Sequence, residues 1–143
     1  MPSKPRRDDL AAMLSPLLRD LVAAELPVLA ARDLTMWGYV VLIALDRSPV
    51  RTQAALAEAI GADKTRIIGT LDELQQRGFI ERHPDPDDRR VRLLAITDAG
   101  RAAKDDAQEE IQRGEERWLS QLSADERRVF LQVLERLARE GPG

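Results

Sequence analysis

The stretch TQAALAEAIGADKTRIIGTLDELQQRGFIERHPDPDDRRVRLLAIT, from Thr52 to Thr97, determines how the chain is organised. Its pattern predicts a short helix, a tight turn, a second helix and two apolar strands. A charged loop, His83–Arg90, joins the strands. A helix pair followed by a hairpin with a charged tip is typical of a winged helix-turn-helix. In that motif one helix enters a major groove and the hairpin contacts the DNA beside it.

The two helices of this stretch have recognisable ends. Thr52 can cap the first helix, Gln53–Ile60, and Gly61 supplies the permissive backbone of a sharp turn. Asp63 can cap the second helix, which we expect to stop at Gly78. The residues that must point inward from this second helix are Ile67, Leu71 and Leu74. Its opposite, N-terminal surface therefore offers Lys64, Thr65, Arg66 and Gly69 to solvent or DNA.

The strands of the hairpin are predicted over Phe79–Arg82 and Val91–Ile96, which are rich in apolar and β-branched residues. Prolines and aspartates break regular structure between them, so the arginines lie at or beside the tip. Asp88 and Arg90 are two residues apart and can face each other across the turn. The carboxylate would then hold the guanidinium in one orientation, which matters more than the modest energy of an exposed pair. The lone His83 is expected to be a surface residue.

Two helices are predicted before this stretch. From about Asp8 to Ala30, leucines recur at three- and four-residue spacings, although prolines should start, kink or end helical segments there. We expect one long, bent helix or two short ones, whose apolar stripe either covers the core or packs against a second subunit. Thr35 can cap the next helix, in which Trp37 and Tyr39 fit a core better than a ligand pocket. The following Val50-Arg51 is long enough only for a short strand or an extended connector.

Two more helices are predicted after the stretch. Thr97-Asp98 can begin a long, heavily charged helix that extends to about Leu119. Ser123 and Glu126 have the spacing of a capping box. The last helix then presents large apolar residues at helical spacing, namely Phe130, Val133, Leu134 and Leu137.

Length and composition exclude several classes of protein. The chain has 143 residues, no cysteine and one histidine, which favours one domain without a metal site, a cofactor or thiol chemistry. No nucleophile–base pair, phosphate loop or metal spacing supports an enzyme. The longest apolar run, Tyr39–Leu45, is too short to span a membrane, so we expect a cytoplasmic protein. The net charge is −3, and its acidic excess lies in residues 98–143, away from the helix pair and hairpin.

Six local strings follow one another in a fixed order. They are Asp33-Leu34-Thr35, Ala54-x-Leu56-Ala57, Ala62-Asp63-Lys64-Thr65-Arg66, Leu71-Asp72-x-Leu74-x-x-x-Gly78-Phe79-Ile80-Glu81-Arg82, Asp85-Pro86-x-Asp88-x-Arg90 and Leu94-x-Ile96-Thr97-x-x-Gly100-Arg101. In this order the chain resembles the MarR family of bacterial transcriptional regulators. The similarity covers about residues 33–101, and the flanking helices match only by pattern.

The resemblance implies a mainly α fold with a small β-hairpin wing (α+β) and an obligate homodimer that binds a palindromic operator. Residues 1–143 then form one MarR-like domain, with dimerisation helices at 8–32 and 98–140 and a winged helix-turn-helix lobe at 33–97. Two-fold symmetry would place the recognition helices roughly 34 Å apart. The residues assigned to the dimer interface are Leu10, Leu14, Leu17, Leu21, Phe130, Leu134 and Leu137.

The resemblance also assigns DNA contacts to the recognition helix. Thr65 and Arg66 lie where the family faces base edges, and Lys64 is better placed for phosphate. Many relatives continue with a polar residue and an arginine, but this chain has Ile68 and Gly69. Gly69 costs roughly 1 kcal/mol of helix stability and removes a possible contact. The operator is therefore expected to differ from the usual pattern, and Ile68 either packs inward or touches a thymine methyl.

The wing supplies the second group of expected contacts. Arg90, oriented by Asp88, matches the arginine that enters the minor groove in the family. Arg89 is expected to contact phosphate. The simpler alternative for each of these charges is a solvated surface residue.

The resemblance implies a small-molecule effector, largely apolar or aromatic, between the dimerisation helices and the DNA-binding lobe. Trp37 and Tyr39 are the candidate residues of that pocket. The effector would act by binding one spacing of the two lobes better than the other. A ligand-free regulator, and a winged-helix protein-interaction module without base-specific DNA binding, remain alternatives.

Overall fold

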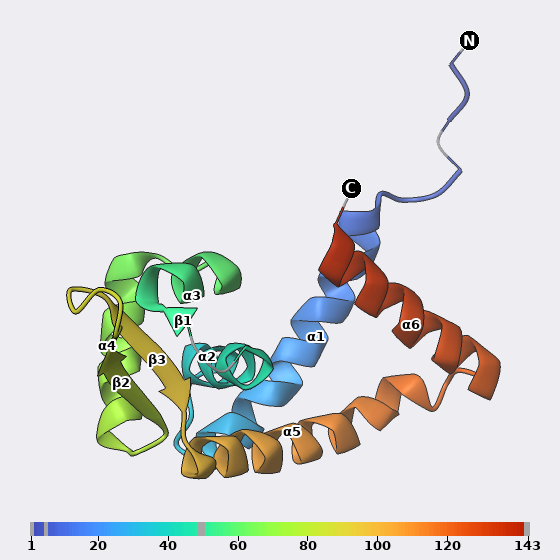
Figure 1. Cartoon of the computed structure of the whole chain (residues 1–143). Helices are drawn as coiled ribbons and strands as arrows, with labels where there is room; N and C mark the ends of the chain where they lie inside the picture. The colour runs from blue at the N-terminus through green and yellow to red at the C-terminus, as the bar shows by residue number, and fades with distance from the viewer. Residues whose placement is uncertain (1, 5, 49–50, 142–143) are drawn as a thin grey trace.

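The computed structural model describes residues 2–4, 6–48 and 51–141. Figure 1 shows a lobe that contains the sheet, with long helices that extend away from it. The elements in chain order are α1 (Leu10–Ala30), α2 (Met36–Arg47), β1 (Arg51–Thr52), α3 (Gln53–Ile60), α4 (Lys64–Gln76), β2 (Ile80–Pro84), β3 (Arg92–Ile96), α5 (Asp98–Leu119) and α6 (Ala124–Glu140). This confirms the predicted fold class, which is mainly helical with a small β-hairpin wing.

Side-chain caps begin five of these helices, as the sequence predicts. In each case the cap accepts a hydrogen bond from a backbone N–H of the first turn. The caps are Thr35, Thr52, Asp63, Thr97 and Ser123, the last in a complete capping box with Glu126. The turns after α3 and α4 need positive φ, which Gly61 (+68°) and Gly78 (+74°) supply.

The three strands form an antiparallel sheet in the order β1-β3-β2. One expectation is corrected here. His83 and Pro84 were expected in the loop, but they belong to β2 and pair with Leu93 and Arg92. β2 is an edge strand, so Pro84 at its end does not remove a hydrogen bond from the interior of the sheet. The expected extended segment at Val50-Arg51 is described only from Arg51, which lies in β1, and Val50 falls outside the described residues.

The hydrophobic core lies where α2 packs against α3, α4, α5 and β3. Its largest fully buried side chains are Leu29, Val41, Leu42, Leu45, Leu56, Leu71, Ile80 and Leu94. Tyr39 is 5% exposed, which confirms its prediction as a core residue. Ile67, Leu71 and Leu74 are buried from α4, so the opposite face of that helix is free.

α1 is one continuous helix. Pro16 and Pro27 lie inside it and do not divide it, so the alternative of two short helices is wrong. Leu29, near its C-terminal end, is fully buried in the core, whereas large apolar residues along the preceding turns are exposed. Figure 1 shows α6 folding back from the end of α5 towards the first turns of α1. Among the described residues, no helix is both long and apolar enough to cross a membrane.

Candidate nucleic-acid interface

The N-terminal turn of α4 is a polar, cationic surface. Asp63 Oδ1 accepts a hydrogen bond from the Thr65 N–H at 3.1 Å, which fixes the start of the helix. The side chains of Lys64, Thr65 and Arg66 are exposed, while the neighbouring Ile67 is only 2% exposed and anchors the turn to the core. The positive end of the helix dipole adds to these charges, so this surface suits an anion such as phosphate.

The next two residues of α4 also face solvent. Ile68 is 45% exposed, so of the two orientations expected for it, the outward one is observed. Gly69 is exposed, and a Cβ built on it meets nothing within 4 Å in the described part of the chain. Directly after its cationic first turn, the outer surface of the helix therefore presents an exposed aliphatic side chain and a residue without a side chain.

The wing carries an arginine held by a carboxylate. Arg90 Nε donates to Asp88 Oδ1 at 3.1 Å, and Arg90 Nη2 donates to Asp88 Oδ2 at 3.3 Å. The Arg90 backbone N–H also donates to Asp88 Oδ1, at 3.1 Å. These bonds from the Arg90 side chain and backbone lower the pKa of Asp88. The side chains of Asp88 and Arg90 therefore face each other across the turn, as predicted. The Arg90 side chain is still 91% exposed.

The loop that presents Arg90 is closed by its own backbone. The Asp85 N–H donates to the Val91 carbonyl at 2.9 Å, and the Val91 N–H donates to the Asp88 carbonyl at 2.9 Å. Asp85 Oδ1 also accepts from the Asp87 N–H, at 2.9 Å. The aspartates of this loop therefore act as turn formers, which leaves the exposed Arg89 and Arg90 as its cations.

A polar contact that the sequence analysis missed joins the wing to α4. Arg82 Nη1, from β2, donates to Asp72 Oδ1 at 2.6 Å and to Gln75 Oε1 at 3.0 Å. The i, i+3 spacing of Asp72 and Gln75 on α4 was the available signal, but nothing local identifies β2 as their partner. The contact pairs the exposed carboxylate of Asp72 on α4 with a cation of the wing.

A second missed feature joins the wing to α5. A Cβ at Gly100 would lie 2.1 Å from the Phe79 carbonyl oxygen, so the first turn of α5 approaches the backbone before β2 too closely for any other residue. The Thr97 hydroxyl donates to the Gly78 carbonyl at 2.6 Å across the same junction. The orientation of the hairpin is therefore tied to the start of α5.

Ion pairs tie α5 to α2. Asp46 accepts from Arg101 Nε at 2.9 Å and lies 2.6 Å from Lys104 Nζ. Lys104 is buried, with 7% exposure, and its Nζ also lies 2.5 Å from Asp105 Oδ1. Hydrogen bonds from Lys104 and then Arg101 lower the pKa of Asp46. The first half of α5 is thus held to the lobe that carries α4.

The loop between α1 and α2 is tied to α5 and to α4. Arg32 donates to Asp106 at 2.6 Å and to Glu110 at 2.9 Å, both on α5. Arg77, at the end of α4, donates to the carbonyls of Arg32 (3.2 Å) and Asp33. A displacement of α1 against α5 would therefore be transmitted to α4 through this loop.

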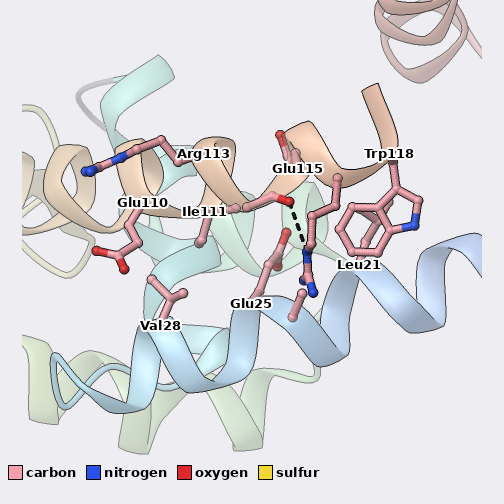
Figure 2. Close-up of a pocket in the computed structure, with 11 residues that line it drawn as sticks. Leu21, Glu25, Val28, Glu110, Ile111, Arg113, Glu115 and Trp118 are labelled. Carbon is pink, nitrogen blue, oxygen red and sulfur yellow. Dashed lines mark hydrogen bonds between the residues drawn. The ribbon is translucent and has the colours of Figure 1, made fainter. Parts of the chain in front are cut away.

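An open cavity of about 440 Å³ lies between α1 and α5 (Figure 2). Its apolar lining includes Leu21, Val28, Ile111 and Trp118. Glu25 and Glu115 also line it. Burial and then the charge of Glu115 raise the pKa of Glu25, while burial and then the charge of Glu116 raise the pKa of Glu115.

The residues expected to line an effector pocket lie elsewhere. Tyr39 is in the core, where burial and then the charge of Glu25 raise its pKa to about 12. Trp37 is half-buried in the first turn of α2. Neither contributes to the cavity between α1 and α5. Trp118, the second tryptophan of the chain, lines the cavity and was not among the residues predicted for a pocket.

The helices outside the lobe expose many large apolar side chains. A groove of about 390 Å³ lies between α1 and α6 and is lined by leucines of both helices together with Trp118 and Phe130. The exposed members of this surface include Leu10 (62%), Leu14 (48%), Leu18 (61%), Phe130 (37%), Leu134 (45%) and Leu137 (58%). Leu17 and Leu21 are half-buried and also line the groove. Apolar patches of this kind mark interaction sites in soluble proteins.

Comparison with known proteins assigns the class. The MarR family model matches residues 34–91. A crystal structure of MarR has 31% identity and a TM-score of 0.83, and the match covers 97% of this chain and 95% of that one. The transcriptional repressor CouR bound to a 23-mer DNA duplex has 32% identity and a TM-score of 0.77, with coverage of 92% and 93%.

Two further matches are informative. CouR from Rhodococcus jostii RHA1 bound to p-coumaroyl-CoA has 29% identity and a TM-score of 0.74, with coverage of 96% and 97%. The HTH-type transcriptional regulator YdgJ of Bacillus subtilis is 30% identical over 86 residues, which are 60% of this chain and 52% of that protein. The chain thus spans about half the length of this curated relative. It belongs to the MarR family of winged helix-turn-helix transcriptional regulators.

Proposed function

We propose that this protein is a sequence-specific DNA-binding repressor that acts as a homodimer on an inverted-repeat operator and responds to a small effector. The observation that carries the proposal is the presence, on one lobe, of a free cationic helix start and a wing arginine that is 91% exposed yet held by Asp88. An exposed arginine held in one orientation suits insertion into a narrow groove. The similarity to the repressor CouR supports the direction of regulation.

The contacts divide by chemistry. Thr65 and Arg66 contact base edges in the major groove, where a bidentate arginine–guanine pair supplies about 1–3 kcal/mol of discrimination. Lys64 and Arg89 contact phosphates, which adds affinity without sequence preference. Arg90 enters the minor groove beside the recognition helix.

The dimer forms through α1 and α6. The exposed leucines of α1 and the Phe130 face of α6 make a surface too apolar to face water in a stable monomer. A second copy would bury both faces, and two-fold symmetry would place two recognition helices about 34 Å apart, in successive major grooves.

The effector binds in the cavity between α1 and α5. Ile111 and Trp118 suit an apolar or aromatic body, and p-coumaroyl-CoA bound to CouR is a ligand with such a group. Because α5 is fastened to the lobe through Asp46, a ligand that changes the separation of α1 and α5 changes the spacing of the two lobes. Trp37 and Tyr39 are left out of this site, because they lie outside the cavity.

The test is selection of bound sequences from a random duplex pool, followed by affinity measurement over a salt series. We expect enrichment of an inverted repeat, with affinity that falls steeply as salt rises. Enrichment should be lost in Arg66→Ala and Arg90→Ala. If no inverted repeat is enriched by the folded wild-type protein, the proposed function is wrong.

A further inference from the structure

The outer face of α4 contains an isoleucine, Ile68, that is not buried in the core. The other large aliphatic residues of this helix, Ile67, Leu71 and Leu74, are at most 3% exposed, whereas Ile68 is 45% exposed. Asp72, four residues later, bonds Arg82 of the wing strand β2. Residues four apart share a helix face, so Ile68 lies on the side of α4 that faces the wing.

The glycine that follows is equally unexplained by the fold. Gly69 lies in the interior of α4, where glycine is among the least favourable helix residues. A Cβ at this position would meet nothing within 4 Å among the described residues, and the backbone of Gly69 is not in the positive-φ region. Neither close packing nor backbone conformation within the chain requires a glycine here.

We propose that Ile68 and Gly69 determine operator specificity: Ile68 contacts the C5-methyl group of a thymine, and Gly69 lets that base edge approach the helix backbone. This inference rests on the proposed function and names the base that the site selects. The thymine methyl is the apolar group that a base pair presents in the major groove. An aliphatic side chain beside it removes apolar surface of both from water.

The neighbouring residues favour DNA as the partner of this apolar spot. Thr65 is three residues before Ile68 and Lys64 is four before it, so both share its side of the helix. A hydroxyl and an ammonium suit a base edge and a phosphate. Asp72, which would repel DNA, is paired with Arg82 at 2.6 Å. A phosphate backbone that approaches this face therefore meets no free carboxylate from Asp72.

The experiment uses the selected operator and removes thymine methyls one at a time by replacing each thymine with deoxyuridine. We expect one thymine in each half-site at which the wild-type protein loses affinity by about fourfold, the change that corresponds to about 0.8 kcal/mol for one methyl-sized group. With Ile68→Ala the same deoxyuridine should have no effect, because the partner of the methyl is gone. The other thymines serve as internal controls.

Gly69→Ala supplies an independent measurement. The substitution should raise the melting temperature, because alanine favours the helix, and should lower affinity for the selected operator at least tenfold. If Gly69 had only a structural role, its replacement would not raise the melting temperature and lower the operator affinity at the same time. Thermal unfolding of Ile68→Ala is expected to match that of wild type, since the side chain is half exposed.

Two failures are distinguishable. If no inverted repeat is enriched, the proposed function is wrong and this inference falls with it. If an operator is enriched but deoxyuridine has no effect that depends on Ile68, the regulator stands and the thymine assignment is overturned. Unchanged operator affinity in Gly69→Ala would likewise overturn the role given to the glycine.

Discussion

Arg90 and Asp88 illustrate how a single residue pair can matter for geometry and little for stability. The pair is exposed, and exposed ion pairs contribute little to folding. Two side-chain bonds and one backbone bond nevertheless restrict the guanidinium to one direction. An arginine that is already oriented loses less conformational entropy when it enters a groove, so the carboxylate acts on binding through the arginine.

Arg90→Ala should reduce affinity for the selected operator by about 10- to 100-fold, or roughly 1–3 kcal/mol, and leave the melting temperature unchanged. Fluorescence anisotropy over a salt series measures the loss. Arg128→Ala is the matched control, because this arginine is 59% exposed on α6, away from the proposed contacts with DNA. Equal losses in the two variants would contradict a specific role for Arg90.

Asp88→Asn should weaken DNA binding less than Arg90→Ala, because the arginine remains but is held less firmly. In the Arg90→Ala background the same substitution should add nothing, since there is no guanidinium left to orient. A double-mutant cycle of operator affinity measures this coupling. Additive effects would show that Asp88 acts on DNA independently of Arg90.

At the scale of elements, α5 carries two glycines with opposite requirements. Gly100 lies against the Phe79 carbonyl, where a Cβ would clash at 2.1 Å, while a Cβ at Gly114 would meet nothing within 4 Å in the described structure. The same residue type is therefore obligatory in the first turn of the helix and dispensable in its C-terminal third.

The two substitutions to alanine should change stability in opposite directions. Gly100→Ala should lower the free energy of unfolding by about 2 kcal/mol or more, because backbone atoms cannot yield to the added methyl. Gly114→Ala should raise it by about 0.4–1 kcal/mol, because the unfolded chain loses freedom. Urea denaturation of both variants measures the difference, and a loss of stability in Gly114→Ala would contradict it.

The junction between α2 and α5 predicts a pH dependence. Pairing with Lys104 and Arg101 lowers the pKa of Asp46 in the folded state. The carboxylate of Asp46 therefore stabilises the fold fully above the unfolded value of 3.8, and this stabilisation is lost as pH falls through the folded pKa. Asp46→Asn should destabilise the protein by about 2 kcal/mol at pH 7, because a buried ammonium loses one of its two carboxylate partners.

Urea denaturation at pH 7 and pH 3 checks this junction. The difference in the free energy of unfolding between wild type and Asp46→Asn should narrow at the lower pH. The reason is that pH 3 lies below the unfolded value of 3.8, so the unfolded wild-type chain takes up a proton at Asp46 there. Asp98→Asn is the control, since Asp98 is fully exposed and its contact with Arg101, at 3.2 Å, is a surface pair. A difference that is independent of pH would exclude the charge of Asp46 as the cause.

At the scale of the whole molecule, the core lies in the lobe and includes buried residues of α1 and α5, while the far parts of α1 and α5, together with α6, present an apolar surface. A dimer through this surface requires a mass of about twice 16.0 kDa by light scattering at micromolar concentration. Leu134→Asp should shift the mass to that of the monomer, because a buried charge at a dimer seam is costly.

Ile68→Asp is the matched control for the dimer. Leu134 and Ile68 are both 45% exposed, but Ile68 lies on α4, away from the α1–α6 groove. The control variant should remain dimeric and lose operator affinity. A wild-type mass near that of one chain would contradict the proposed assembly.

Local chemistry determined much of the fold. Helix starts could be predicted at Thr52, Asp63 and Ser123, because a cap needs only its own side chain and the backbone two or three residues away. Gly61 and Gly78 were predictable for the same reason, as was the pairing of Asp88 with Arg90 across one turn. These features depend on neighbours in the sequence, so a reader of the sequence can find them.

Tertiary structure decided the contacts between distant segments. Arg82 meets Asp72 because the hairpin folds back along α4, and Lys104 meets Asp46 because α5 crosses the end of α2. The cavity beside Trp118 exists only once α1 and α5 lie side by side. The sequence by itself therefore determined the family, the caps and the charged wing. Tertiary structure decided how the wing is braced and that Ile68 faces outward, because the distances between separate elements depend on packing of the whole chain.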